Sequence, residues 1–356
     1  MDQMNLVGIS RNPLKSVKIF LNQNAARNTI VRNAMWITLS LVFFLLPAQV
    51  HAQQFSFSVS PPLVEMIIKP GKSVVIAYTI TNGGDPTIIS ANVLPFQPHG
   101  ISGDVELKKD MEGPIRFALD NSNIQLGKPF MLQPRKGQQL LVNIRVPEGT
   151  PEGDYYYTFF VQNELGKPTE GVSAAQAQGR VGAHILVTVT QSGRIEAGGS
   201  IGSLSVKPHY SFNLFGSQFD IFESTDIIPV TLIVQNTGKN YIKPEGVLNL
   251  KGSLGENADF SVLPQNILSQ SSRRINATPS AQVSSLDGSE PASLLLSGFF
   301  FGKYTLTAHL SFGPNTGSHT SLVTFYAFPF KLMISAGLAL IVGIVIIQQL
   351  KNKKQD

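Results

Sequence analysis

The sequence predicts an all-β fold in which two tandem antiparallel β-sandwiches lie between an N-terminal signal peptide and a C-terminal transmembrane helix. Three observations carry this prediction. Short segments rich in Val, Ile, Tyr, Phe and Thr recur through the middle of the chain, and Gly, Pro, Asn and Asp separate them. The two halves of this region share a weak internal repeat. Two uncharged apolar segments lie near the two ends of the chain.

The first apolar segment, Met35–Leu46, has the layout of a signal peptide. It is twelve residues long, carries no charge and follows several basic residues. Pro47 ends it, and the small residues Val50 and Ala52 stand three positions and one position before the expected cleavage site. Twelve helical residues span only about 18 Å, which is too short for a hydrocarbon core of about 30 Å. We therefore expect residues 1–52 to be a leader that is removed after Ala52, with an uncleaved anchor as the alternative.

The second apolar segment, Leu332–Leu350, is long enough to cross a membrane. Its nineteen residues carry no charge and span about 28 Å as a helix. Lysines follow it, which favours a cytoplasmic C-terminus, and Tyr326, Phe328 and Phe330 precede it where interfacial aromatic residues are typical. The sequence predicts a transmembrane helix with a basic tail over 331–356, and a buried core helix is the alternative.

Charge and cysteine content exclude several classes of function. The net charge of +5 comes from the two ends, because residues 53–330 hold 19 basic and 21 acidic residues and so carry about −2. We therefore expect no nucleic-acid partner. The chain has no cysteine, which removes disulfides, cysteine-zinc sites, iron–sulfur clusters and thiol nucleophiles. We expect no cofactor and no metal site.

The predicted strands fall into two series. The first comprises Phe55–Val59, Ser73–Thr81, Thr87–Leu94, Gln138–Val146, Tyr155–Gln162 and His184–Thr190. The second comprises Ile228–Gln235, Gly246–Lys251, Ser293–Phe299, Tyr304–Phe312 and Ser321–Phe328. Many short strands at intervals marked by turns are typical of antiparallel sandwiches.

The internal repeat pairs an apolar strand that ends in asparagine with a later strand that opens with Gly-x-Tyr. Val74–Asn82 resembles Ile228–Asn236, and Gly153–Tyr155 resembles Gly302–Tyr304. A tyrosine at the start of a late strand is typical of the tyrosine corner of Ig-like sandwiches. We expect two Ig-like domains, 53–191 and 192–330, and the Gly- and Ser-rich stretch near the boundary is either a short linker or a strand that enters the second domain. The two asparagines are expected to shape turns rather than to bind a ligand.

Several turn-like motifs resemble those of a bacterial surface family. They are Ser58–Glu65, Lys69–Gly71 and Thr81-Asn82 in the first half, and Val234–Gly238, Pro244–Gly246, Ile267–Arg273 and Phe301–Tyr304 in the second. The layout is similar to that of the WxL-interacting proteins of Gram-positive bacteria, which have a signal peptide, two Ig-like domains, a transmembrane helix and a basic tail. The resemblance implies binding to surface partners, including WxL-domain proteins and peptidoglycan. The long leader departs from that pattern.

A search for catalytic groups finds only weak candidates. The histidines of residues 53–330 have no metal-binding spacing, although His309 and His319 can be neighbours across a hairpin. Gly198–Gly202 matches Gly-x-Ser-x-Gly around Ser200, but a hydrolase elbow needs a following helix, which the sequence does not show. The acidic residues Asp104, Glu106, Asp110 and Glu112 surround two lysines. They can form a carboxylate pair for glycoside chemistry, although a solvated surface is the simpler interpretation. We expect no enzymatic activity.

Two aromatic segments are candidate partner contacts. In a strand over Tyr155–Phe160, Tyr155 and Tyr157 lie on one face with Phe159, and Tyr156 lies on the other with Phe160. One face must be core; the other is covered by loops or the neighbouring domain, or is an exposed platform. The second segment holds Phe212, Phe215, Phe219 and Phe222, whose spacing suits a helical stripe, although Gly216 and the neighbouring strands argue against a helix.

These observations predict a membrane-anchored extracellular binding or scaffold protein that contacts a surface protein or peptidoglycan. Residues 53–330 are expected outside the cell, in a single-pass topology, and sheet edges or loops would hold the partner. The alternative is a periplasmic chaperone-like module that captures exported subunits, which Phe96–Pro98 and Val146-Pro147 fit. The sequence does not set an oligomeric state.

Overall fold

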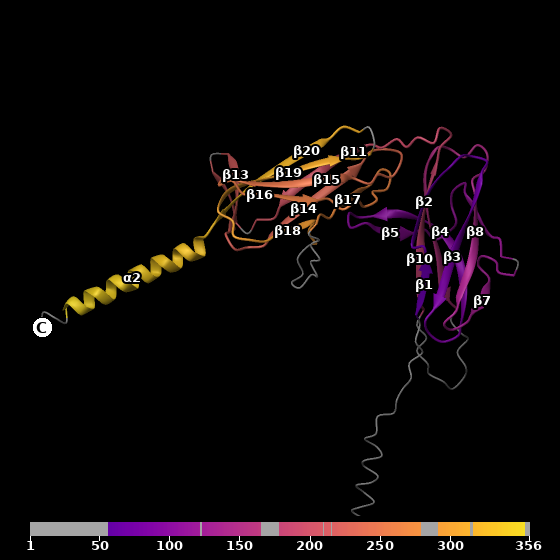
Figure 1. Ribbon diagram of the computed structural model, residues 1–356, viewed down its shortest axis with the longest axis horizontal. Coiled ribbons are helices and arrows are strands. Elements are labelled where there is room, and N and C mark those ends of the chain that lie inside the picture. Colours follow the sequence, from indigo (N-terminus) through magenta and orange to yellow (C-terminus); the bar gives the residue numbers. More distant parts are fainter. Residues whose placement is uncertain are drawn as a thin grey trace, which may run out of the picture. The chain divides into compact units, whose positions relative to one another are not determined.

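The computed structural model describes residues 56–121, 123–164, 178–208, 210–214, 216–278, 291–313 and 316–352 (Figure 1). Contacts divide the chain into two units, Met1–Gln54 and Phe55–Asp356, and the description below concerns the second. The predicted signal peptide and its cleavage site lie outside the described residues.

The first sandwich is built from ten strands. They are β1 (Phe57–Ser60), β2 (Leu63–Ile68), β3 (Ser73–Asn82), β4 (Thr87–His99), β5 (Asp104–Leu107), β6 (Arg116–Leu119), β7 (Pro129–Leu132), β8 (Gly137–Arg145), β9 (Gly153–Asn163) and β10 (Arg180–Val189). One sheet has the order β1-β3-β8-β6, and the other has the order β2-β10-β9-β4-β5, with β7 also paired to β4. Tyr78 and Phe159 are fully buried between the sheets, with ring centroids 4.6 Å apart.

The N-terminal segment of this sandwich contributes to both sheets. β1 pairs with β3 in one sheet, and β2 pairs in parallel with β10 in the other. Pro61 and Pro62 separate the two short strands. Because proline cannot donate a ladder hydrogen bond, the pair ends β1 and lets the chain cross to the second sheet. The parallel β2–β10 ladder is therefore an exception to the antiparallel pairing that the sequence predicts.

The second sandwich is also built from ten strands. They are β11 (Gly199–Val206), β12 (Tyr210–Leu214), β13 (Ser217–Glu223), β14 (Ile228–Asn236), β15 (Glu245–Gly252), β16 (Asn257–Ser261), β17 (Ser272–Arg274), β18 (Leu294–Leu296), β19 (Gly302–Ser311) and β20 (His319–Phe328). One sheet has the order β11-β14-β17, with β18 also paired to β14, and the other has the order β12-β13-β20-β19-β15-β16. Its core includes Phe222, Tyr304 and Phe325, and the last two rings stack with centroids 5.5 Å apart.

Strand periodicity explains where these cores lie. In β14 the alternate side chains of Ile228, Val230, Leu232 and Val234 are fully buried, as a strand with one face on the core requires. The mostly-β architecture with two sandwiches is confirmed. Each predicted strand overlaps an observed one. The bounds differ most at three strands: β18 is only Leu294–Leu296 rather than Ser293–Phe299, β4 extends to His99 beyond the predicted end at Leu94, and β10 begins at Arg180 rather than at His184.

Two uncertain segments adopt strands. The Gly- and Ser-rich stretch enters the second sandwich as β11, and the predicted boundary at residue 191 falls between the end of β10 and this strand. Residues 210–223 form the β12–β13 hairpin rather than a helical stripe. Gly216 has a φ of 78°, a left-handed conformation that glycine adopts without steric cost and that reverses the chain.

The internal repeat has a structural basis in two buried asparagines. Asn82 ends β3 and accepts a hydrogen bond from the Gly84 N–H at 2.9 Å; Asn236 ends β14 and accepts one from the Gly238 N–H at 2.8 Å. Both side chains are almost fully buried. Each Oδ1 therefore mimics a backbone carbonyl and closes a turn, which agrees with the expectation that these residues shape turns.

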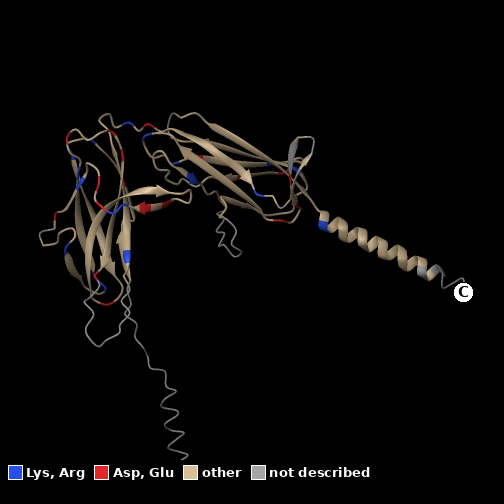
Figure 2. Cartoon of the chain, turned by 180° about the vertical axis from the view of Figure 1, so that it is seen from behind, with Lys and Arg blue, Asp and Glu red and all other residues tan. Residues whose placement is uncertain are grey.

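A single apolar helix follows the last strand. Helix α2 (Phe330–Asn352) has 23 residues, about 34 Å at 1.5 Å per residue, and its segment Phe330–Gln348 is apolar and long enough to cross a membrane. None of this window is buried against the rest of the described structure. The charged residues of α2 are Lys331 and Lys351, and in Figure 2 the ribbon that follows the blue start of the helix is tan. A buried core helix, the alternative from the sequence, is therefore wrong.

Candidate functional site

The carboxylate of Asp154, at the start of β9, connects the two sandwiches. Its Oδ1 accepts hydrogen bonds of 2.8 Å from Thr188 Oγ1 in the first sandwich and from Asn240 Nδ2 in the second. Its Oδ2 accepts from the Tyr241 N–H and, at 3.0 Å, from the Tyr156 hydroxyl. Hydrogen bonds to a charged acceptor are stronger than neutral ones. A single side chain thus holds four donors from both sandwiches.

Glu65 of β2 makes a second connection. Its Oε2 accepts from Lys243 Nζ and its Oε1 from Asn266 Nδ2, both at 2.6 Å. The Tyr156 hydroxyl adds a third, because it accepts from the Ser269 N–H at 2.8 Å. Acidic groups of the first sandwich therefore meet donors of the second at separate points. The junction is defined by directional contacts rather than by a loose linker.

A hairpin of the first sandwich supplies the apolar part of the junction. β4 runs past the sheet and turns into β5, and the turn contacts the second sandwich where the Ile101 carbonyl accepts from the Arg274 N–H at 2.7 Å. Phe96 of β4, Leu186 of β10 and Leu268 are buried together. The partly buried side chains packed on them are Val105, Leu107, Tyr156 and Tyr241.

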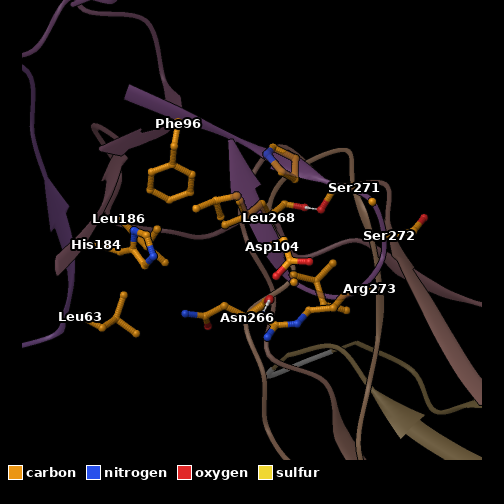
Figure 3. Close-up of a pocket in the computed structure, with 15 residues that line it drawn as sticks. Leu63, Phe96, Asp104, His184, Leu186, Asn266, Leu268, Ser271, Ser272 and Arg273 are labelled. Carbon is orange, nitrogen blue, oxygen red and sulfur yellow. Dashed lines mark hydrogen bonds between the residues drawn. The ribbon is translucent and has the colours of Figure 1, made fainter. Parts of the chain in front are cut away.

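Part of this apolar cluster forms one side of a pocket that also has a polar end (Figure 3). Leu63, Phe96, Leu186 and Leu268 line the apolar part. The polar lining comprises Asp104, His184, Asn266, Ser271, Ser272 and Arg273. The cavity is about 200 Å³ in volume, below the range of about 300–1,000 Å³ of small-molecule sites. It suits one side chain of a partner better than a cofactor.

Two polar atoms at this end are buried without a hydrogen-bond partner among the described residues. They are Arg273 Nε and Asn266 Oδ1, a donor and an acceptor. The Arg273 guanidinium is held by Nη1, which donates to the Asn266 carbonyl at 2.6 Å. A buried unpaired polar group costs about 1–3 kcal/mol. The wall of the pocket therefore contains one buried donor and one buried acceptor that have no partner among the described residues.

Burial changes the titration of the groups around the junction. Desolvation lowers the pKa of the Arg273 guanidinium, and Asp104 partly opposes this effect. Desolvation raises the pKa of the Tyr156 hydroxyl, and the charge of Asp154 raises it further. The pKa of Tyr241 is raised to about 12, first by burial and then by Glu65 and Asp154. Both hydroxyls stay protonated near neutral pH and keep their roles as donors or acceptors.

His184 lies beside Phe96, with ring centroids 4.9 Å apart, and its Nδ1 is 2.9 Å from Thr158 Oγ1. Burial lowers the pKa of this histidine below its usual 6.5. The folded state therefore disfavours the protonated ring, and the unfolded state binds the extra proton first on acidification. The stabilising contribution of neutral His184 is complete above about pH 6.5 and is lost as the pH falls through and below that value.

We expect a His184→Gln variant to lose part of the acid sensitivity of the protein. Thermal unfolding between pH 7.5 and pH 5 should show a smaller fall in Tm for this variant than for the wild type. His309→Gln, at an exposed histidine of β19, is the matched control. Equal pH profiles for the wild type and His184→Gln would contradict this account.

The predicted contact residues do not line the pocket. Tyr157 is buried in the first core, while Tyr155 is only partly buried and its hydroxyl donates to the Pro151 carbonyl at 3.0 Å, a bond of the tyrosine-corner kind. Phe222 is fully buried in the second core. Phe212 and Phe219 face each other in the β12–β13 ladder, and Phe215 lies outside the described residues. A partner contact at these positions stays a prediction.

The weak catalytic candidates have structural roles or none. Lys108 and Glu112 form an exposed ion pair of 2.6 Å, so the acidic segment is at least partly a solvated surface. Ser200 lies in β11 opposite Gln235, and the next described element is another strand, so the context of a hydrolase elbow is missing. His309 and His319 lie on paired strands, but His309 is opposite Thr320 and His319 is opposite Leu310, so the two histidines are on opposite faces of the sheet. No group of three metal-ligating side chains occurs in the part of the chain that the structure describes.

Sequence reasoning missed the pocket itself. Its residues come from segments that read as turns, including Ser58–Glu65, Phe96–Pro98 and Ile267–Arg273. The signal that was available is the apolar residue next to each turn, Leu63, Phe96 and Leu268. Each of these is more apolar than a solvated turn requires.

Comparison with known proteins assigns neither a family nor a function to the chain. No family model matches the chain, and no curated protein matches it. The class 5 fimbriae chaperone CfaA has 11% identity and a TM-score of 0.33, over 77% of this chain and all of that one. The Escherichia coli chaperone DraB has 16% identity and a TM-score of 0.31, over 77% and 98%. A PapD-like domain of human CEP192 has 15% identity and a TM-score of 0.25, over 41% and 93%. These likenesses assign no family; the strand pairing itself shows two tandem β-sandwiches, and one apolar helix follows them in the described residues.

Proposed function

We propose that this chain is a membrane-anchored binding or scaffold protein of the bacterial cell surface, similar in role to the WxL-interacting proteins. Helix α2 anchors it, residues 53–330 lie outside the cell, and the basic tail lies in the cytoplasm, where Lys351, Lys353 and Lys354 favour its retention. The partner is a surface protein, with peptidoglycan as the other source of contact. The observation that carries the proposal is the junction pocket beside strand β2.

The pocket and β2 together suit an extended segment of a protein partner. β2 is an end strand of its sheet within the described residues, and such a strand can pair with another chain through its backbone. Leu63, which is 41% exposed, lies on β2 and lines the pocket. A segment that pairs with β2 can therefore place one side chain in the pocket, beside Asn266 and Arg273.

Protease treatment tests the location. Protease added to intact cells is expected to degrade residues 53–330 and to leave a membrane-protected fragment that contains α2. The control is the same digestion after permeabilisation, which should also remove the basic tail. If the region survives on intact cells and is lost only after permeabilisation, the extracellular location is wrong.

Crosslinking on intact cells tests the partner site. A Leu63→Glu variant places a charge at the mouth of the pocket and is expected to lose most of the specific partner that the wild type captures. Val247→Glu, at a similarly exposed position of β15, is the matched control and should retain it. A partner captured equally by both variants, or no partner above a control that carries only α2, would contradict the proposed site.

The chaperone-like alternative rests on the same pocket and edge strand but predicts a different partner. It requires exported subunits that are bound transiently and released, whereas a scaffold retains its partner at steady state. A pulse-chase version of the crosslinking distinguishes the two. Rapid loss of the crosslinked partner would favour the chaperone.

A further inference from the structure

Exposed apolar side chains gather at one end of the second sandwich. We name the proximal patch as Ile227, Leu254, Phe299, Phe301 and Phe328, which are 57%, 70%, 63%, 42% and 42% exposed. They come from three turns and from the end of β20. At the opposite end, the described positions of loops 237–241, 263–271 and 312–318 contribute no exposed large apolar residue, and the segment that leads into β11 contributes Ile195, which is 42% exposed.

Backbone hydrogen bonds and a ring contact bring the members of the patch together. The β15–β16 turn, which holds Leu254, is tied to the start of β19 by the Ser253 N–H, which donates to the Lys303 carbonyl at 2.9 Å. The rings of Phe301 and Phe328 stack with centroids 6.0 Å apart. The turn that holds Ile227 joins them because the Ser224 carbonyl accepts from the Phe300 N–H at 2.8 Å.

The patch is continuous with the apolar helix. β20 ends at Phe328 and α2 begins at Phe330, so Pro329 alone separates them. The first turn of α2 is held to the sandwich, because the Lys331 N–H donates to the buried Glu223 carboxylate at 2.9 Å. The Phe330 ring also meets Tyr210 edge to face at 5.4 Å. One residue spans less than about 4 Å, so the patch cannot be far from the point where the span begins.

We propose that the proximal patch lies in the interfacial layer of the same bilayer that α2 crosses, so that the second sandwich is seated on the lipid. The proposal rests on the membrane anchor of the proposed function. Contiguous exposed apolar side chains are unfavourable in water, and aromatic rings are enriched at the headgroup level. The helix brings the bilayer to this end of the domain, and a protein partner would have to displace that lipid to reach the patch.

The absence of tryptophan from residues 53–356 makes a direct test possible. The only tryptophan of the chain is Trp36, so a full-length Trp36→Phe background can report on one introduced site at a time. Phe299→Trp and Phe301→Trp report on the patch, and Leu340→Trp reports on the middle of the span. Leu322→Trp is the matched control, because Leu322 is 63% exposed and lies six residues before Phe328 on β20, about 20 Å along the strand.

Each variant is reconstituted in phosphatidylcholine vesicles that carry a spin-label quencher either near the headgroup or near the end of the acyl chain. We expect the shallow quencher to remove most of the emission of Phe299→Trp and Phe301→Trp, the deep quencher to act on Leu340→Trp, and neither to act on Leu322→Trp. If Leu340→Trp is quenched while the patch variants behave like Leu322→Trp, the seat is overturned and the anchor stands. If Leu322→Trp is quenched as strongly as the patch, the seat is also overturned. If Leu340→Trp is not quenched, the anchor fails and the seat fails with it.

Discussion

An Asp154→Ala variant is expected to be less stable than the wild type by about 3 kcal/mol and to unfold in two separate steps. The substitution removes the acceptor of four hydrogen bonds at once. Thr188 and Asn240, two of the donors, are buried, and a buried donor without its acceptor costs about 1–3 kcal/mol. Because Asn240 and Tyr241 belong to the second sandwich, the junction should weaken more than either core.

Urea unfolding of the full chain in detergent micelles, followed by far-ultraviolet circular dichroism, measures this loss. Asp120→Ala is the matched control, since Asp120 is exposed and its carboxylate accepts hydrogen bonds from the Asn143 amide. It should change stability by no more than about 0.5 kcal/mol. Asp154→Asn also tests the junction, because its amide nitrogen cannot accept hydrogen bonds from the donors that it would face. Equal stability of the Asp154 and Asp120 variants would remove the junction role of this carboxylate.

The second large effect is expected at Asn236. Its Nδ2 donates to the Asn240 carbonyl at 2.8 Å and to the Ile267 carbonyl at 3.0 Å, and its Oδ1 accepts from the Gly238 N–H. Alanine at this buried position leaves the two carbonyls and the Gly238 N–H without this hydrogen-bond partner. We expect the free energy of unfolding to fall by about 3 kcal/mol. The second sandwich should then unfold first.

The internal repeat provides the comparison for this variant. Asn82 is equally buried, but its side chain makes two hydrogen bonds, to the Asp85 carbonyl and from the Gly84 N–H. Asn82→Ala should therefore cost less, about 1–2 kcal/mol. Differential scanning calorimetry of both variants measures the order. A larger loss at Asn82 than at Asn236 would contradict the idea that the number of hydrogen bonds decides the cost.

The parts of the fold that sequence predicts well are those where a local pattern has one structural meaning. The alternation in β14 places Ile228, Val230 and Leu232 on one face, and only a half-buried strand satisfies it. The uncharged run of α2 is similar. In contrast, β5, β6 and β7 have four residues each, which is too short for a period to show. They form because longer neighbours offer them a ladder.

The junction could not be predicted because its parts are distant in sequence and individually unremarkable. Phe96 lies in β4 and Arg273 in β17, far apart in the sequence, and nothing local indicates that they line one pocket. The aromatic strand β9 shows the boundary of what periodicity can do. Alternation predicts that one face is core, which holds for Tyr157 and Phe159. It leaves open what covers Tyr156, which the structure places in the junction cluster.

The position of β20 in its sheet determines how the protein responds to being pulled. When a partner pulls on the sandwiches, helix α2 in the membrane opposes the force. A single residue connects this helix to β20. β20 has a neighbour on each side, β19 in antiparallel and β13 in parallel pairing. Ladder hydrogen bonds are perpendicular to the strands in the antiparallel pair and slanted in the parallel pair, so a load along β20 shears both ladders instead of opening them one bond at a time. The strand that continues into the membrane helix is therefore loaded in shear against two neighbouring strands.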